Sequence, residues 1–142
     1  MHDAQAGGAL FTVDSLVAGS QVGCTAVNLL VVNNLRDIDS DSKAGKSTIS
    51  SLLGYEKGRW QLVWNLVFAH VLGLWWLLNG SPFACLLPYS TVPFAADLTH
   101  RVFSTKPSVH YNHLLQSFSL LHLLFSCALA MGLGLSCLVT SA

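Results

Sequence analysis

Long apolar runs separated by short polar stretches dominate this sequence, and these runs define its expected elements. Four apolar segments occupy residues 15–32, 60–78, 82–96 and 114–139. A helix needs about 20 apolar residues to cross the hydrocarbon core of a bilayer, and the first, second and fourth segments provide them. Because backbone groups in lipid must be hydrogen-bonded internally, each segment is predicted to be helical. The sequence therefore predicts an all-α, multi-pass bundle of four transmembrane helices.

The third segment, 82–96, is shorter than the others, and two prolines, Pro88 and Pro93, interrupt it. Proline in a membrane helix is tolerated when neighbouring helices satisfy the carbonyls that it frees. We expect this segment to be a short or broken span that packs within the bundle.

Composition agrees with a membrane protein and excludes other classes. Hydrophobic residues make up 52% of the 142 residues and charged residues only 10%, against about 25% charged residues in an average soluble domain. So few charges cannot cover a soluble surface. The formal net charge is zero, so no basic excess points to nucleic acid.

The basic residues predict how the bundle is oriented. Residues 33–59 carry five Lys and Arg residues and residues 97–113 carry two, whereas 79–81 carry none. By the positive-inside rule both charged stretches face the cytoplasm or its organellar equivalent. The protein is therefore expected in a bacterial plasma membrane or an organellar membrane, with a polar site at one end of the bundle.

Polar and small side chains punctuate the apolar segments. Two polar sets recur at helical spacing, and they are Gln21, Thr25 and Asn28 in the first segment and Ser119, His122 and Ser126 in the last. Such sets either line a cavity or hydrogen-bond neighbouring helices, and the pattern leaves both open. Gly19 and Gly23 are spaced for a close helix contact. The cysteines at 24, 85, 127 and 137 all lie in apolar segments and are expected to be small buried side chains without disulfides.

The chemistry-bearing stretch runs from Asn33 to Gly54 and reads NNLRDIDSDSKAGKSTISSLLG. If the first helix continues past residue 32, Asp37 and Asp41 stand one turn apart on one face, while Asp39 points elsewhere. Two such carboxylates repel each other unless a divalent cation lies between them. Mg²⁺ takes one or two carboxylates and completes its shell with water and substrate phosphates.

Basic residues surround this aspartate pair, and Arg36, Lys43 and Lys46 would neutralise phosphate oxygens that the metal leaves free. A phosphorylated lipid is therefore a better fit than a bare ion, although a solvated interfacial loop of mixed charge has the same pattern. The run Gly45-Lys46-Ser47-Thr48 is not a nucleotide-binding loop, because position 40 is serine instead of the required glycine and a membrane segment precedes it.

The same stretch resembles the second aspartate-rich motif of the UbiA superfamily, and more narrowly the 1,4-dihydroxy-2-naphthoate prenyltransferases of menaquinone and phylloquinone synthesis. The residues that carry this resemblance are Asn33-Asn34-Leu35-Arg36-Asp37, Asp41, Gly45-Lys46, Thr48 and Leu53-Gly54. Residues 98–119, with Arg101-Val102-Phe103 and Asn112-His113-Leu114-Leu115, resemble the last cytoplasmic loop and final helix of the family.

The resemblance implies a nine-helix fold around a cavity, of which the four predicted spans would be the last four. It implies transfer of a polyprenyl group from its diphosphate to 1,4-dihydroxy-2-naphthoate. Asp37 and Asp41 would then be the catalytic metal ligands for Mg²⁺, with Asp39 as a further candidate ligand. The residues expected to bind the diphosphate are Arg36, Lys43, Lys46, Asn33 and Asn34.

The family's first motif, of the form Asn-x-x-x-Asp-x-x-x-Asp, is absent from this sequence. A partner chain that carries this motif is one expectation. A non-catalytic membrane fragment that retains Mg²⁺–diphosphate binding is an alternative, and the missing motif favours it. A small four-helix transport subunit is another alternative; the polar stripes favour it, and the absence of charges at mid-membrane speaks against it.

The second polar stretch contains Arg101, Lys106, His110 and His113. These residues are expected on the same membrane face as the aspartates, where they either close the site and bind the carboxylate of the acceptor or anchor to lipid headgroups. His70 and His122 lie within apolar segments and are expected to be hydrogen-bonded interior side chains.

Overall fold

The computed structural model describes residues 12–108 and 110–140, and all the regular structure in these ranges is helical. Three of its helical stretches are long and apolar enough to cross a membrane: Val13–Arg36, Tyr55–Leu78 and Tyr111–Val139. The prediction of an all-α membrane helix bundle is therefore confirmed. The helices are α1 (Val13–Arg36), α2 (Ile38–Lys43), α3 (Ile49–Leu53), α4 (Tyr55–Leu72), α5 (Leu74–Leu78), α6 (Pro82–Tyr89), α7 (Val92–Ser104) and α8 (Tyr111–Thr140).

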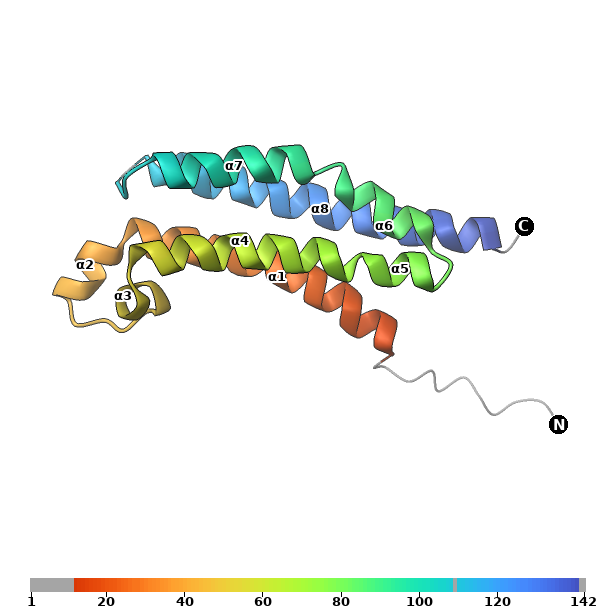
Figure 1. The fold of residues 1–142 in the computed structure, drawn as a ribbon, viewed down its shortest axis with the longest axis horizontal. Helices are drawn as coiled ribbons and strands as arrows, with labels where there is room; N and C mark the ends of the chain where they lie inside the picture. Colours follow the sequence, from red (N-terminus) through yellow and green to blue (C-terminus); the bar gives the residue numbers. More distant parts are fainter. Residues whose placement is uncertain (1–11, 109, 141–142) are drawn as a thin grey trace.

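The long helices form two antiparallel layers (Figure 1). In one layer α4 and α5 run alongside α1, and in the other α6 and α7 run alongside α8. Extensive contacts between α1 and α8 join the two layers. The charged segments α2 and α3 and the turn between α7 and α8 all lie at one end of this bundle, and the turn between α5 and α6 lies at the other end (Figure 1).

The third apolar segment is two helices instead of one. Helix α6 ends at Tyr89 and α7 begins at Val92, with Ser90 and Thr91 between them. Pro88 lies in the last turn of α6, where it removes an amide donor from the helical ladder. Pro93 lies in the first turn of α7, where the amide has no helical acceptor and proline is tolerated. Helix α7 also continues to Ser104, well past the apolar part of the segment.

The polar stretch 33–59 is more helical than its composition suggests. Helix α1 extends to Arg36, and α2, α3 and the first turn of α4 all fall within the stretch. Thr48 shows why α3 forms: its hydroxyl accepts the Ser51 amide while the Ser51 hydroxyl accepts the Thr48 amide. Such a capping box satisfies amides that would otherwise lack partners. Local capping, which hydropathy does not report, thus extends helices into the polar region.

Two apolar clusters hold the bundle together, one toward the α2–α3 end and one toward the α5–α6 turn. The first contains Val31, Val32, Leu35, Leu62, Leu66, Ala95, Leu98, Val102, Tyr111, Leu114, Phe118 and Leu121. The second contains Ala69, Trp76, Ala84, Cys85, Phe125 and Leu129. The first cluster draws on α1, α4, α7 and α8, so it fixes the polar end of all four long segments relative to one another.

The polar stripe of α1 forms interhelical hydrogen bonds. Thr25 bonds to His122 Nδ1 of α8 at 2.8 Å, and Asn28 bonds to the Leu62 carbonyl at 3.4 Å and accepts from Asn65 at 2.9 Å. Gln21, Thr25 and Asn28 are all buried. Of the two interpretations that the sequence left open, helix association is the one that the contacts of this stripe support.

Gln21 closes a break in a neighbouring helix. Where α4 ends, the Gly73 amide bonds to the His70 carbonyl, so the Ala69 carbonyl loses its usual helical donor. Gln21 Nε2 donates to this carbonyl at 2.9 Å, and Gln21 Oε1 accepts from the Trp76 indole at 2.7 Å. Both of the groups that Gln21 satisfies therefore belong to the break between α4 and α5.

Replacing Gln21 by leucine is expected to lower the free energy of unfolding in detergent by about 1–2 kcal/mol, the range for polar contacts between membrane helices. The reason is that the Ala69 carbonyl and the Trp76 indole lose their partner. Gln116→Leu is the matched control, because Gln116 is exposed on α8. Equal unfolding midpoints for the two variants would contradict this role for Gln21.

The glycine that allows a close helix contact lies in α8, at Gly132, where α8 crosses α6. The sequence had instead indicated Gly19 and Gly23 of α1. A Cβ added at Gly132 would lie 2.4 Å from the Phe83 carbonyl oxygen and 2.6 Å from Ala84 Cα. By contrast, a Cβ at Gly19 or Gly23 would meet nothing within 4 Å. The prediction that Gly19 and Gly23 form a close helix contact is therefore wrong within the described residues.

The burial of the cysteines was predicted correctly only in part. Cys85 is buried and Cys24 is half-buried, whereas Cys127 and Cys137 are exposed on α8, and none of the four forms a disulfide within the described residues. The prediction is wrong for these two because an apolar context in a membrane helix fits the lipid-facing side as well as the protein interior.

Candidate functional site

The two aspartates singled out by the sequence lie where α1 passes into α2. Asp37 separates the helices, yet its amide bonds to the Asn33 carbonyl at 3.1 Å, and the Asp41 amide bonds to the Asp37 carbonyl at 2.8 Å. These are i to i−4 hydrogen bonds, so the helical register persists through the junction. Asp37 and Asp41 therefore stand one helical turn apart.

Arg36 holds Asp37 in a two-point ion pair and reaches a second element as well. Its Nε and Nη2 donate to the two carboxylate oxygens of Asp37, both at 2.7 Å. Its Nη1 donates to Asn112 Oδ1, at the start of α8, also at 2.7 Å. The planar guanidinium thus ties the α1–α2 junction to α8, which is 76 residues away in sequence.

The Arg36 hydrogen bonds hold the pKa of Asp37 below its usual value. Partial burial of the carboxyl opposes this effect, and the charges of Arg36 and Lys46 add to it. The ionised form of Asp37 is therefore favoured in the folded protein.

This lowered pKa predicts a pH dependence. The ion pair stabilises the fold fully above the unfolded Asp pKa of about 3.9, and its contribution is lost as the pH falls through the lower folded value. The unfolding midpoint of the protein in detergent should therefore exceed that of Asp37→Asn at neutral pH, and the gap should narrow below about pH 4. A difference in unfolding midpoint that stays constant down to pH 2 would contradict this role of the Arg36–Asp37 ion pair.

The end of α2 brings Lys46 back to Asp41. Gly45 adopts φ 68°, its amide bonds to the Ser42 carbonyl and the Lys46 amide bonds to the Asp41 carbonyl. This pair of bonds is the Schellman arrangement, in which glycine takes the left-handed conformation that ends a helix. As a result Lys46 Nζ lies 3.5 Å from Asp41 Oδ1.

Only one of the two carboxylate oxygens of Asp41 contacts Lys46. The Asp41 side chain is 13% exposed, and Oδ2 is buried with no hydrogen-bond partner in the part of the chain that the structure describes. A buried anionic oxygen without a partner is costly, so this atom is suited to a cation. The described residues contain no group of three or more His, Cys, Asp or Glu side chains that could hold a metal ion. Any metal here would need further ligands from a substrate or from solvent.

The remaining predicted site residues lie outside the Arg36–Asp37 and Lys46–Asp41 ion pairs. Asp39 and Lys43 are exposed on α2, outside the contacts just described. Asn33 and Asn34 are half-buried in the last turn of α1, and Asn33 is one turn before Asp37. The structure thus joins Arg36 with Asp37 and Lys46 with Asp41, but it does not bring Asp39 or Lys43 into either pair.

A polar pocket of about 300 Å³ opens beside the Arg36–Asp37 pair, and Ser108 and Asn112 form its other side. Sequence reasoning gave no role to Ser108 or Asn112. Asn112 belongs to a segment that carries the family resemblance, but no local pattern places either residue at the site, because they approach Asp37 only when α8 packs against α1.

A second cluster that the sequence did not indicate fixes the turn between α7 and α8. The Tyr55 hydroxyl donates to the Thr105 carbonyl at 2.7 Å and bonds to the Tyr111 hydroxyl. The buried Arg59 donates to the Tyr55 hydroxyl and to the Thr105 carbonyl, and it lies over the Tyr55 ring at 3.8 Å. These contacts hold the turn against the start of α4.

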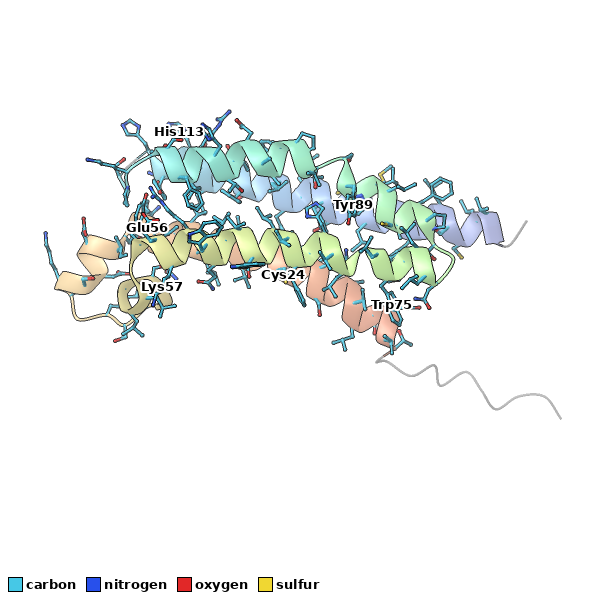
Figure 2. All side chains as sticks on the ribbon, viewed as in Figure 1. Cys24, Glu56, Lys57, Trp75, Tyr89 and His113 are labelled. Carbon is cyan, nitrogen blue, oxygen red and sulfur yellow. The ribbon has the colours of Figure 1, made fainter. Side chains whose placement is uncertain are left out.

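The other residues that the sequence singled out lie either on the surface toward the polar end or in the interior of the bundle. Arg101 pairs with Asp97 on the exposed side of α7 at 2.9 Å, and His113 lies at the polar end, far from Trp75 at the opposite end (Figure 2). The interior histidines are hydrogen-bonded, as predicted. His70 Nδ1 bonds to the Leu66 carbonyl, and His122 bonds to Thr25.

Fold and site together describe an integral membrane helix bundle with an acidic and basic site at one end. Over 115 residues the chain is 30% identical to 1,4-dihydroxy-2-naphthoate octaprenyltransferase of Haemophilus influenzae. The match covers 78% of this chain and 36% of that enzyme, so the chain spans about a third of the length of this curated relative. No protein-family profile and no solved structure matches the chain.

Proposed function

We propose that this chain is the C-terminal part of a UbiA-type prenyltransferase of quinone biosynthesis. In the complete enzyme it would help to transfer a polyprenyl group from its diphosphate to 1,4-dihydroxy-2-naphthoate. The observation that carries the proposal is the Asp37–Asp41 pair at the polar end of a membrane bundle, in a chain 30% identical to a naphthoate octaprenyltransferase.

The residues at the α1–α2 junction fit Mg²⁺ shared with a substrate. Asp41 offers the partner-free Oδ2, and Mg²⁺ requires only one or two carboxylates when phosphates complete its shell. Asp37 becomes available when Arg36 exchanges its carboxylate partner for another anion. Mg²⁺ bound at Asp37 and Asp41 would supply charge that stabilises the departing diphosphate.

The basic side chains would bind and orient the diphosphate. Three N–H groups of Arg36 donate to Asp37 and Asn112 beside the pocket, and a guanidinium that exchanges a carboxylate for phosphate oxygens binds them in the same two-point manner. Lys46 lies against Asp41 and contributes to the field at Asp37. Lys43, exposed on the last turn of α2, would approach the diphosphate from solvent, and Asn33 and Asn34 would line its α1 side.

A complete site needs more than this chain provides, according to the family resemblance. The relative has nearly two thirds of its length outside the matched region, and the resemblance implies a first aspartate-rich motif that faces the second. We therefore propose that a chain or segment carrying that motif pairs with this one.

A prenyl-transfer assay in membranes tests the proposal. The substrates are 1,4-dihydroxy-2-naphthoate and a polyprenyl diphosphate, with Mg²⁺ or with EDTA. The samples are this chain alone and this chain co-expressed with the N-terminal part of the Haemophilus influenzae enzyme, up to the matched region. We expect Mg²⁺-dependent product in the co-expressed sample. Absence of product, with the two parts folded and associated, would refute the proposal.

A further inference from the structure

We propose that the turn between α7 and α8 supplies two binding residues for the phosphate groups of a Mg²⁺-bound prenyl diphosphate: Ser108 and Asn112. This inference rests on the proposed function and extends its site across the bundle, from the α1–α2 junction to the start of α8. It assigns a ligand to the pocket that Arg36, Asp37, Ser108 and Asn112 line.

The hydrogen bonds of Asn112 and Ser108 use their acceptor atoms, so their donor groups remain available to an anion. Asn112 Oδ1 accepts from Arg36 Nη1, so its amide donor, Nδ2, points away from the guanidinium. The Ser108 hydroxyl oxygen accepts from the His110 amide at 3.3 Å, so its own proton can be donated elsewhere. Both side chains thus offer donors beside the pocket, and donors are what phosphate oxygens require.

Charge determines which anion fits. Asp37 already neutralises Arg36 through its two-point ion pair, and Ser108 and Asn112 are neutral. The pocket therefore has little net positive charge for a bare phosphate or a lipid headgroup, because no metal accompanies these anions to take Asp37 over from Arg36. A diphosphate that brings its own Mg²⁺ to Asp37 and Asp41 is compatible with this balance, because the metal compensates for the acidic side of the site.

The turn is held firmly enough to position these donors. The Tyr55 hydroxyl and Arg59 both bond to the Thr105 carbonyl, and the Tyr111 hydroxyl bonds to the Tyr55 hydroxyl and the Val102 carbonyl. Thr105 and Tyr111 flank Ser108 on its two sides. Groups that are fixed before binding lose less entropy when a ligand arrives.

Asn112→Asp separates ligand binding from a structural role. The new carboxylate still accepts from Arg36, so the tie between α1 and α8 is kept, but the amide donor is lost and a negative charge faces the ligand. A purely structural Asn112 predicts normal binding in this variant. A ligand-binding Asn112 predicts weak binding with an unfolding midpoint at or above that of the unchanged protein.

The experiment measures the binding of inorganic diphosphate with Mg²⁺ to the full chain in phosphatidylcholine nanodiscs by calorimetry. We expect Asn112→Asp to weaken binding about tenfold or more, and Ser108→Ala by a smaller factor, as for lost hydrogen bonds to a charged group. Gln116→Asp adds the same charge one turn along α8, and its affinity should stay within about twofold of the unchanged protein, because Gln116 is not among the residues that line the pocket.

The outcomes distinguish this inference from the proposed function. If the unchanged chain does not bind Mg²⁺-diphosphate, the proposed site fails and this inference fails with it. If binding occurs and Asp37→Asn abolishes it, while Asn112→Asp and Ser108→Ala bind normally, only this inference is overturned. The same titration is repeated with the chain in phosphatidylglycerol nanodiscs. If this lipid displaces the diphosphate, with the same dependence on Asn112, the ligand is a lipid headgroup and this inference is overturned.

Discussion

Asparagine at position 37 or 41 is expected to reduce Mg²⁺-dependent prenyl transfer at least about 100-fold in the co-expressed enzyme, the scale on which metal-site and charge-stabilising groups act. Each substitution keeps the size of the side chain and removes its charge. At Asp41 it removes the negative charge of a carboxylate whose Oδ2 is buried without a hydrogen-bond partner among the described residues. At Asp37 it also releases Arg36 from its two-point ion pair. The measurement is the initial rate over a range of Mg²⁺ concentrations.

Two other aspartates give graded controls for this result. Asp97 pairs with Arg101 on the exposed side of α7, and Asp97→Asn should leave the rate unchanged. Asp39 is exposed on α2 between the two proposed ligands, and Asp39→Asn should reduce the rate less than either of them. Equal rates for Asp37→Asn and Asp97→Asn would remove Asp37 from the catalytic site.

Gly132→Ala is expected to destabilise the bundle by about 3 kcal/mol, in the upper part of the range for overpacking. The added Cβ would lie 2.4 Å from the Phe83 carbonyl oxygen and 2.7 Å from the Ala84 amide nitrogen. Both of these atoms belong to the α6 backbone, so no side-chain rotation relieves the clash and the helices must separate. The unfolding midpoint in detergent, measured with increasing SDS, reports the effect.

Gly134→Ala is the matched control on the same helix. A Cβ at Gly134 would meet no described residue within 4 Å, and alanine favours a helix over glycine by up to about 1 kcal/mol. The control variant should therefore be as stable as the unchanged protein or slightly more stable. Similar losses at both positions would show that α6 and α8 do not cross closely at Gly132.

The sequence predicted the parts of the fold that depend on local pattern. Long apolar runs identified α1, α4 with α5, and α8, and the two prolines indicated the break between α6 and α7. The sequence did not show where the polar helices end, because a capping box at Thr48 and a left-handed glycine at position 45 determine these boundaries. It also misplaced the close helix contact, since spacing alone cannot tell Gly19 from Gly132 without knowing which helix packs there.

The candidate site divides in the same way. The spacing of Asp37 and Asp41 is local, so it was accessible once the first helix was assumed to continue. The neutralisation of Arg36 by Asp37 is also local, but its bond to Asn112 spans 76 residues and depends on how α8 packs against α1. The contributions of Ser108, Asn112 and the Tyr55–Arg59 cluster therefore required the tertiary structure.

The break between α6 and α7 bears on how the chain enters a membrane. Neither helix reaches the about 20 residues needed to span a bilayer, and the second carries Asp97 and Arg101. These two charges belong to the polar stretch at the membrane face, so only α6 and the first part of α7 are left to enter the hydrocarbon core. Helices α6 and α7, which form one arm of the hairpin with α8, should therefore remain at the bilayer surface until α8 is synthesised. The close crossing at Gly132 then gives α6 a helix to pack against. The last two arms of the bundle would then insert together.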